Sequence, residues 1–300
     1  MPARAFSLHA PAYRGRSVHR GRSGLQAPGD HMTYLAALLI LTALALCARW
    51  TWWRKEIPGL RVLCYHKIGR PPAGSQLEDL WVSPRKFRVQ VQYLLDHGYT
   101  TLLFSDLLKA FRENSPLPEK CVLITFDDGY ENNYLEAWPI LNELGAKGNI
   151  FVVFNTIGKA NLWHDPASEA WVNMATPDQL REMQSSGVIE YGSHTMSHPH
   201  LSALSLDDAA WEMAESKRQL ETVLGSVLCA FAYPYGDGAY SPEIRAKALE
   251  AGYTFDFSFR HGKTPWPWDR PGSPIDRIFI RGSDTIWDLA LQLSRGFSRL

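Results

Sequence analysis

Residues 121–130 read CVLITFDDGY, and this stretch is the best guide to the fold. Its first six residues are apolar or β-branched, as expected of a short strand, and the two acidic residues and the glycine are typical of a loop that ends it. Seven similar runs lie near residues 61–66, 100–104, 149–154, 188–192, 228–232, 253–258 and 276–280. We therefore expect eight strands.

Helical stretches lie between most of these strands. Three helices are expected to begin where a hydroxyl residue that caps a helix precedes a proline, at Ser83-Pro84, Thr176-Pro177 and Ser241-Pro242. A glycine stands where each should end, at Gly98, Gly187 and Gly252. Alternating strands and helices over roughly 240 residues predict one α/β domain with a parallel sheet closed like a barrel. No glycine-rich nucleotide fingerprint follows the first strand.

Charge and composition exclude several classes of protein. The 300 residues carry 31 Lys+Arg and 31 Asp+Glu, and 45% are hydrophobic, which is not the composition of a disordered chain. Residues 1–31 hold five Arg and one Asp, so the rest of the chain has a net charge of −4. A mildly acidic body gives no basic surface for nucleic acid. The four cysteines form no C-x-x-C pair, which argues against a thiolate zinc site.

The N-terminal part predicts a membrane segment. Residues 33–48 contain no charge, and Trp50, Trp52 and Trp53 would extend the segment to the roughly 20 residues that a span needs. We interpret 1–31 as a basic low-complexity tail, 32–53 as a transmembrane anchor or signal segment, and 60–296 as the globular domain. The anchor would leave the domain outside the cytoplasm, periplasmic or extracellular. A signal peptide cleaved near Ala43-x-Ala45 would make the protein secreted.

Polar clusters follow three of the expected strands. They are Asp127-Asp128-Gly129-Tyr130, the segment SHTMSHPH at 193–200, and Tyr233-Pro234-Tyr235-Gly236. In a parallel barrel the carboxyl ends of all strands face one mouth, so these clusters should converge there. Alone, an acidic turn or an H-x-x-x-H pair is a weak signal. Together they indicate a site.

The residue types in these clusters are those of a hydrolytic metal site. His194 and His198 lie four residues apart, and with one carboxylate they can bind an ion and leave positions open for water and substrate. The second carboxylate is then free to take a proton from that water.

The strings TFDDGY at 125–130 and HTMSHP at 194–199 resemble the polysaccharide deacetylases of the NodB-homology type, carbohydrate esterase family 4. The resemblance covers roughly residues 60–285, including Tyr65-His66 and the 233–236 loop. It implies an α/β fold, a distorted (β/α) barrel, preceded here by one N-terminal apolar helix. It further implies one divalent metal, usually Zn²⁺, and removal of N-acetyl groups from an aminosugar polymer.

By position, the resemblance implies that Asp127 is the general base and that Asp128, His194 and His198 are the metal ligands. The backbone N–H of Tyr235 would stabilise the oxyanion that forms as water attacks the acetamide carbonyl.

Two positions depart from the family pattern. Ala232 stands where the third motif usually has Arg, and residues 279–281 read FIR where a His usually supplies the general acid. His66 and His261 are the candidates for the acid, and for each a purely structural role is an equal alternative. We interpret Arg281 as the residue that keeps Asp127 ionised. The variant pattern resembles the branch that acts on poly-N-acetylglucosamine exopolysaccharides.

Two long loops, 155–175 and 260–275, are expected to border the substrate groove. Trp163 and Trp266 would offer flat faces to sugar rings, and Tyr233 would also contact substrate. The alternative is that these tryptophans only pack the loops.

We therefore predict a membrane-anchored, metal-dependent N-deacetylase whose partner is a polysaccharide, either an exopolysaccharide, a chitin-like polymer or peptidoglycan. One alternative is a catalytically silent glycan-binding barrel in an export or synthesis assembly. Another is a deacylase of a small or lipid-linked sugar.

Overall fold

The computed structural model describes residues 29–50, 55–167, 169–270 and 272–298. Most of the basic tail, and Trp52 and Trp53, lie outside the described residues. The chain divides into two compact units, Met1–Leu46 and Cys47–Leu300. The predicted apolar helix is confirmed as α1, Gly29–Trp50. Within it, His31–Arg49 has a mean hydropathy of 1.9, and by length and composition alone it is sufficient to cross a membrane or to serve as a signal sequence.

The second unit is built around parallel strands. All eight expected strands are confirmed, as β1 (Arg61–Tyr65), β4 (Thr100–Thr101), β5 (Cys121–Phe126), β6 (Gly148–Val152), β7 (Ile189–Ser193), β8 (Ala230–Ala232), β9 (Phe255–His261) and β10 (Ile275–Phe279). Their order is β1-β10-β9-β8-β7-β6-β5-β4, and β1 also pairs with β5. This last pairing closes a barrel of seven strands and leaves β4 outside it. β2 (Lys67–Ile68) and β3 (Trp81–Val82) form a separate parallel pair.

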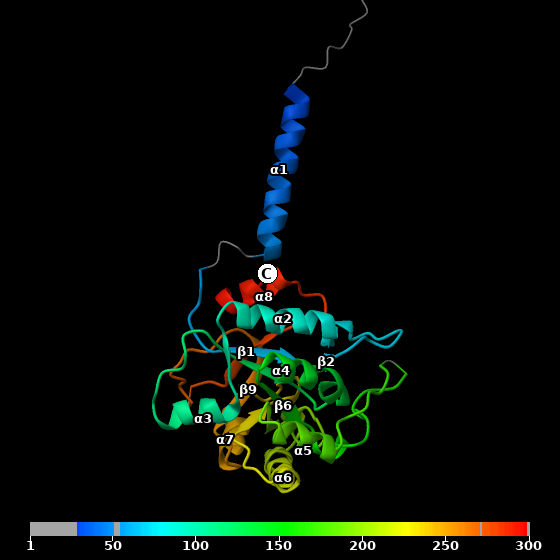
Figure 1. The fold of residues 1–300 in the computed structure, drawn as a ribbon, viewed down its shortest axis with the longest axis vertical. Coiled ribbons are helices and arrows are strands. Elements are labelled where there is room, and N and C mark those ends of the chain that lie inside the picture. Colours follow the sequence, from blue (N-terminus) through cyan, green and yellow to red (C-terminus); the bar gives the residue numbers. More distant parts are fainter. Residues whose placement is uncertain (1–28, 51–54, 168, 271, 299–300) are drawn as a thin grey trace, which may run out of the picture. The chain divides into compact units, whose positions relative to one another are not determined.

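Helices surround the strands, as Figure 1 shows. They are α2 (Pro84–Asp96), α3 (Phe104–Arg112), α4 (Trp138–Leu144), α5 (Pro177–Ser185), α6 (Leu206–Leu224), α7 (Pro242–Glu250) and α8 (Ile286–Arg295). Short 3₁₀ turns lie at Glu78–Leu80, Phe154–Thr156, Leu201–Ala203 and Pro234–Gly236, and a π-helical turn lies at Asn133–Ala137.

The predicted helix starts are confirmed. The side chains of Ser83, Thr176 and Ser241 each accept a hydrogen bond from the backbone N–H three residues later. Such caps satisfy backbone donors that the helix itself leaves unpaired. These local signals therefore fix where α2, α5 and α7 begin.

Side chains along each strand alternate between two buried layers. One cluster contains Val62, Leu123, Phe151 and Phe257, and it fills the barrel. The other contains the intervening residues, such as Leu63 and Ile124, packed against the helices. Successive side chains of a strand point to opposite faces. Residues at the strand ends that continue the alternation of the first cluster therefore face the barrel mouth. Asp127, just after β5, continues the alternation of Leu123 and so faces the mouth.

Candidate active site

The two predicted motifs converge at the carboxyl ends of β5 and β7. Asp128 Oδ1 lies 3.5 Å from His194 Nε2 and 3.3 Å from His198 Nε2. All three residues are buried. The convergence that the sequence predicts is therefore present in the structure.

The backbone that carries these groups adopts a rarely populated conformation. Four of the five non-glycine residues with positive φ among the described residues lie in these loops, namely Asp128 (76°), Thr195 (72°), His198 (62°) and Tyr235 (57°). Such conformations cost free energy and cluster at functional sites. The loop after β7 is held by the Glu212 carboxylate of α6, which accepts from the backbone N–H groups of residues 196 and 197 at 2.8 and 3.0 Å.

The three side chains fit a divalent cation. His194 Nδ1 donates to the Ala232 carbonyl at 2.7 Å, so Nε2 presents its lone pair toward Asp128. Asp128 Oδ1 and His198 Nδ1 are buried without a hydrogen-bond partner in the described chain, and an unpartnered buried carboxylate oxygen is costly unless a cation faces it. Ligand atoms around tetrahedral zinc lie about 3.4 Å apart, given bonds of about 2.0–2.2 Å.

Charge and burial keep Asp128 and His194 in the protonation states that a metal needs. Burial lowers the pKa of His194 to about 4, so its imidazole is neutral near pH 7. Burial alone would raise the pKa of Asp128, but His198, His66 and His194 lower it well below its ordinary value. The site therefore offers an ionised Asp128 carboxylate and a neutral His194 imidazole, the forms in which these groups bind a metal.

Asp127 is paired with an arginine that the sequence analysis missed. Arg277, from β10, donates to Asp127 through Nη1 to Oδ1 at 2.6 Å and Nη2 to Oδ2 at 2.8 Å, and both side chains are buried. Burial would raise the pKa of Asp127, but the Arg277 guanidinium, with His194 and His66, holds it below its ordinary value. The prediction for Arg281 was wrong, because its guanidinium lies over the Phe279 ring instead.

Of the two candidate acids, only His66 lies beside Asp127. His66 Nε2 is 3.8 Å from Asp127 Oδ2, and its ring packs edge-on against those of Phe259 and Phe279. Burial lowers its pKa, although Asp127 opposes the shift. His261 instead packs against Phe297, with ring centroids 5.1 Å apart, and the charges that act on it are Arg281 and Asp284.

Aromatic rings border the cation site. Trp163 stacks on His198 with ring centroids 4.5 Å apart, and Tyr235 meets the same ring edge-on at 4.6 Å. Tyr235 also stacks on His200, and it is 47% exposed. The Tyr235 N–H donates to no residue of the described chain, so it is free for a ligand.

Tyr233 does not reach the substrate surface, and this prediction was wrong. Its side chain is fully buried, and its hydroxyl donates to Asp256 at 3.1 Å. Tyr233 shares the parity of Phe231 along β8, and both pack in the same buried cluster outside the barrel.

The prediction that Trp266 contacts substrate was also wrong. It lies by Leu60, Arg61 and Cys121, where β1 and β5 begin, which is the end of the barrel opposite Asp127. Its indole N–H donates to the Ser115 carbonyl at 3.4 Å. The 260–275 loop turns back along the barrel, as the antiparallel bridge between Leu60 and Thr264 indicates.

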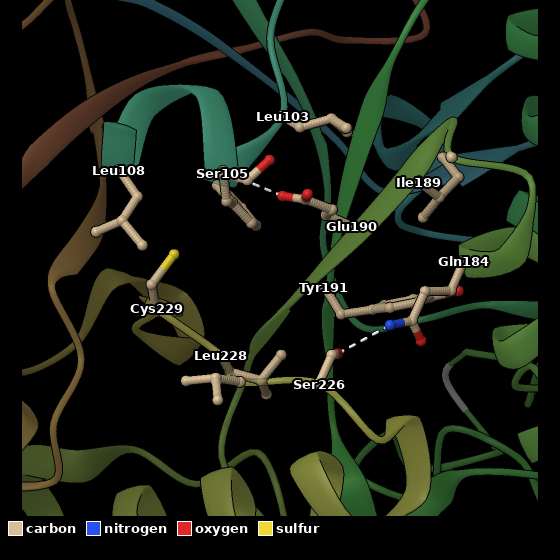
Figure 2. Close-up of a pocket in the computed structure, with 13 residues that line it drawn as sticks. Leu103, Ser105, Leu108, Gln184, Ile189, Glu190, Tyr191, Ser226, Leu228 and Cys229 are labelled. Atoms are coloured by element: carbon tan, nitrogen blue, oxygen red, sulfur yellow. Dashed lines mark hydrogen bonds between the residues drawn. The ribbon is translucent and has the colours of Figure 1, made fainter. Parts of the chain in front are cut away.

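A hollow lies apart from this site, near the residues that precede β7 and β8, and Figure 2 shows its lining. There Glu190 accepts from the Ser105 N–H at 2.8 Å, and Cys229 points into the space. None of the predicted site residues lines it.

Comparison with known proteins agrees with this geometry. A family model described as polysaccharide deacetylase matches residues 114–255. The Bacillus subtilis protein YxkH, whose name places it among the polysaccharide deacetylases, is 32% identical over 203 residues, which are 67% of this chain and 65% of YxkH. The poly-β-1,6-N-acetyl-D-glucosamine N-deacetylase of Escherichia coli K12 is 29% identical over 147 residues, 46% of this chain and 20% of that protein.

A solved structure is similar over most of the domain. The deacetylase PplD of Streptococcus pyogenes, in complex with acetate, superposes with a TM-score of 0.66 at 26% identity, over 79% of this chain and 99% of that one. The chain thus spans less than two thirds of the two curated relatives but nearly all of this structure.

Proposed function

We propose that the chain, which is similar to polysaccharide deacetylases over most of its globular domain, is a metal-dependent hydrolase that removes N-acetyl groups from an aminosugar-containing polysaccharide. The observation that carries this proposal is the buried set of Asp128, His194 and His198, in which Asp128 Oδ1 has no hydrogen-bond partner, directly beside the ionised Asp127. A module that only binds glycan has no physical need for this arrangement.

Asp128, His194 and His198 would hold one divalent ion, most simply Zn²⁺, which when bound supplies Lewis-acid polarisation of water and carbonyl oxygen. Asp127 then takes a proton from the attacking water. Arg277 fixes the orientation of the Asp127 carboxylate through two hydrogen bonds. The Tyr235 N–H donates to the oxygen that becomes negative in the transition state.

We assign protonation of the departing amine to His66. Its lowered pKa means that its imidazole is neutral near pH 7 in the resting site. The proton that it donates must therefore come from the water by way of Asp127, whose Oδ2 lies 3.8 Å from His66 Nε2. On this scheme the water proton passes to Asp127, then to His66, then to the amine.

The substrate that we favour is an exopolysaccharide of N-acetylglucosamine. The support is the resemblance to the Escherichia coli enzyme that acts on the β-1,6-linked polymer, together with Trp163 and Tyr235 beside the cation site. Aromatic faces suit the apolar faces of sugar rings. We further propose that α1 anchors the domain, roughly residues 60–296, outside the cytoplasm, or that the protein is secreted where this segment is cleaved.

An acetate-release screen tests the proposal. The full chain, loaded with Zn²⁺, is incubated with poly-β-1,6-N-acetylglucosamine, chitin oligomers and peptidoglycan. We expect acetate from at least one polymer, with the first preferred, and none from the Asp127→Asn variant. Binding of these polymers without acetate release would favour the silent barrel. Release from small or lipid-linked sugars alone would favour the alternative of a deacylase that acts on such sugars.

A further inference from the structure

A second group of potential metal ligands lies beside the first. Cys64 of β1, His66 just after β1, and Asp127 just after β5 each offer one ligand atom, and these atoms lie within 4.8 Å of one another. The pairing of β1 with β5 sets Cys64 opposite Thr125 and so brings the three together. Cys64 and Asp127 are buried, and the His66 side chain is 11% exposed.

The spacing of these atoms suits a tetrahedral ion. Asp127 Oδ2 lies 3.5 Å from Cys64 Sγ and 3.8 Å from His66 Nε2. Zinc bonds of about 2.3 Å to sulfur and about 2.1 Å to nitrogen or oxygen place the ligand atoms about 3.4–3.6 Å apart. Both distances to Asp127 are therefore close to those around zinc, and the ligand atoms of Cys64 and His66 lie within 4.8 Å of each other.

The donor set also defines the class of ion. A thiolate with an imidazole and a carboxylate favours Zn²⁺ or Cd²⁺, whereas Mg²⁺ and Ca²⁺ prefer oxygen ligands. The Cys64 thiol now donates to Asp127 Oδ2, so an ion would take the place of its proton. Arg277, bonded to the same carboxylate, repels a cation. This second site must therefore bind more weakly than Asp128, His194 and His198.

We propose that Cys64, His66 and Asp127 form a second, inhibitory site for a thiophilic divalent cation. On binding, the Sγ–H bond breaks, an Sγ–metal bond forms, and the proton leaves to solvent. The ion occupies the carboxylate and the imidazole that the proposed reaction uses, so excess metal blocks turnover. The inhibitory effect rests on the proposed function, whereas metal binding to Cys64, His66 and Asp127 does not.

Cadmium titration of the full chain tests binding without any enzyme assay. The second equivalent of Cd²⁺ should produce the ultraviolet charge-transfer absorption of a thiolate–Cd²⁺ bond. Cys64→Ser should lose this absorption and bind one ion fewer. Cys121→Ser and Cys229→Ser are matched controls at the other end of the barrel, and both should keep it. Retention of the absorption in Cys64→Ser, or its absence from the wild type, would overturn the proposal.

Zinc titration of acetate release tests inhibition. Activity should rise to a maximum at one equivalent and fall with excess Zn²⁺, but not with excess Mg²⁺. Serine keeps a hydroxyl donor for Asp127, so Cys64→Ser should still be activated, with the inhibition constant raised at least tenfold. Equal inhibition of both proteins would refute the inhibitory role. If serine prevents folding, as judged by circular dichroism, Cys64→Ala serves instead. If no protein releases acetate, the proposed function fails while the cadmium result still stands.

Discussion

Replacing Arg277 by methionine tests how the charge of Asp127 is maintained. Methionine fills much of the same volume but removes both hydrogen bonds to a carboxylate that is 2% exposed. Breaking a buried ion pair from one side costs about 3–5 kcal/mol. For a domain of this size, about 2–4 °C of melting temperature is lost per kcal/mol, so we expect a decrease of about 6–20 °C.

The loss of stability in Arg277→Met should depend on pH. In the wild type the pKa of Asp127 is below its ordinary 3.8, so the stabilisation is fully present above that value and is lost as pH falls through the folded value. In Arg277→Met, burial is left as the dominant influence and raises the pKa of Asp127. The folded variant then takes up a proton before the unfolded chain does. The stability gap between variant and wild type should therefore narrow on acidification.

Catalysis should respond in the same direction. A base with a raised pKa is protonated at higher pH, so the acidic limb of the activity profile should move to higher pH in Arg277→Met. Arg245→Met is the matched control, because Arg245 forms another buried pair, with Asp256, at 2.7 Å. It should lose similar stability without moving the limb. An unmoved limb in Arg277→Met, or an equal shift in both variants, would refute the reasoning.

Three further substitutions are informative. Gly192→Ala would place its Cβ 2.5 Å from the Phe151 ring that fills the barrel, so unfolding in urea should show a loss of about 1–3 kcal/mol, and an unchanged midpoint would contradict the packing. Tyr233→Phe removes a buried hydrogen bond, so stability should fall by about 1–2 kcal/mol with KM unchanged, whereas a raised KM would return this ring to the substrate surface. Trp163→Ala removes the ring stacked on His198, so KM for the polymer should rise several-fold at constant metal content, and an unchanged KM would exclude a substrate role.

Local signals in the sequence predicted the fold well. Residues 121–126 were expected as a strand and form β5 with the same bounds, and the caps at Ser83, Thr176 and Ser241 lie where expected. These features depend on neighbours within a few residues. The convergence of Asp128 with the two histidines followed from one general property, that parallel strands end at the same mouth.

The misses involve contacts that local patterns do not define. Arg277 meets Asp127 across 150 positions of sequence, and only closure of the barrel through β1 brings β10 near β5. The direction of the 260–275 loop, which carries Trp266 to the opposite end, likewise depends on tertiary packing. Tyr233 could have been placed, because alternation from Phe231 puts it on the outer, buried face.

Metal content and acetate release, measured on the same preparations, test the central claim most directly. We predict about one ion per chain in wild type and in Asp127→Asn, with acetate released only by wild type, and loss of both ion and activity in His194→Ala. An Asp127→Asn protein that hydrolyses at the wild-type rate, or a His194→Ala protein that keeps its ion, would contradict the account.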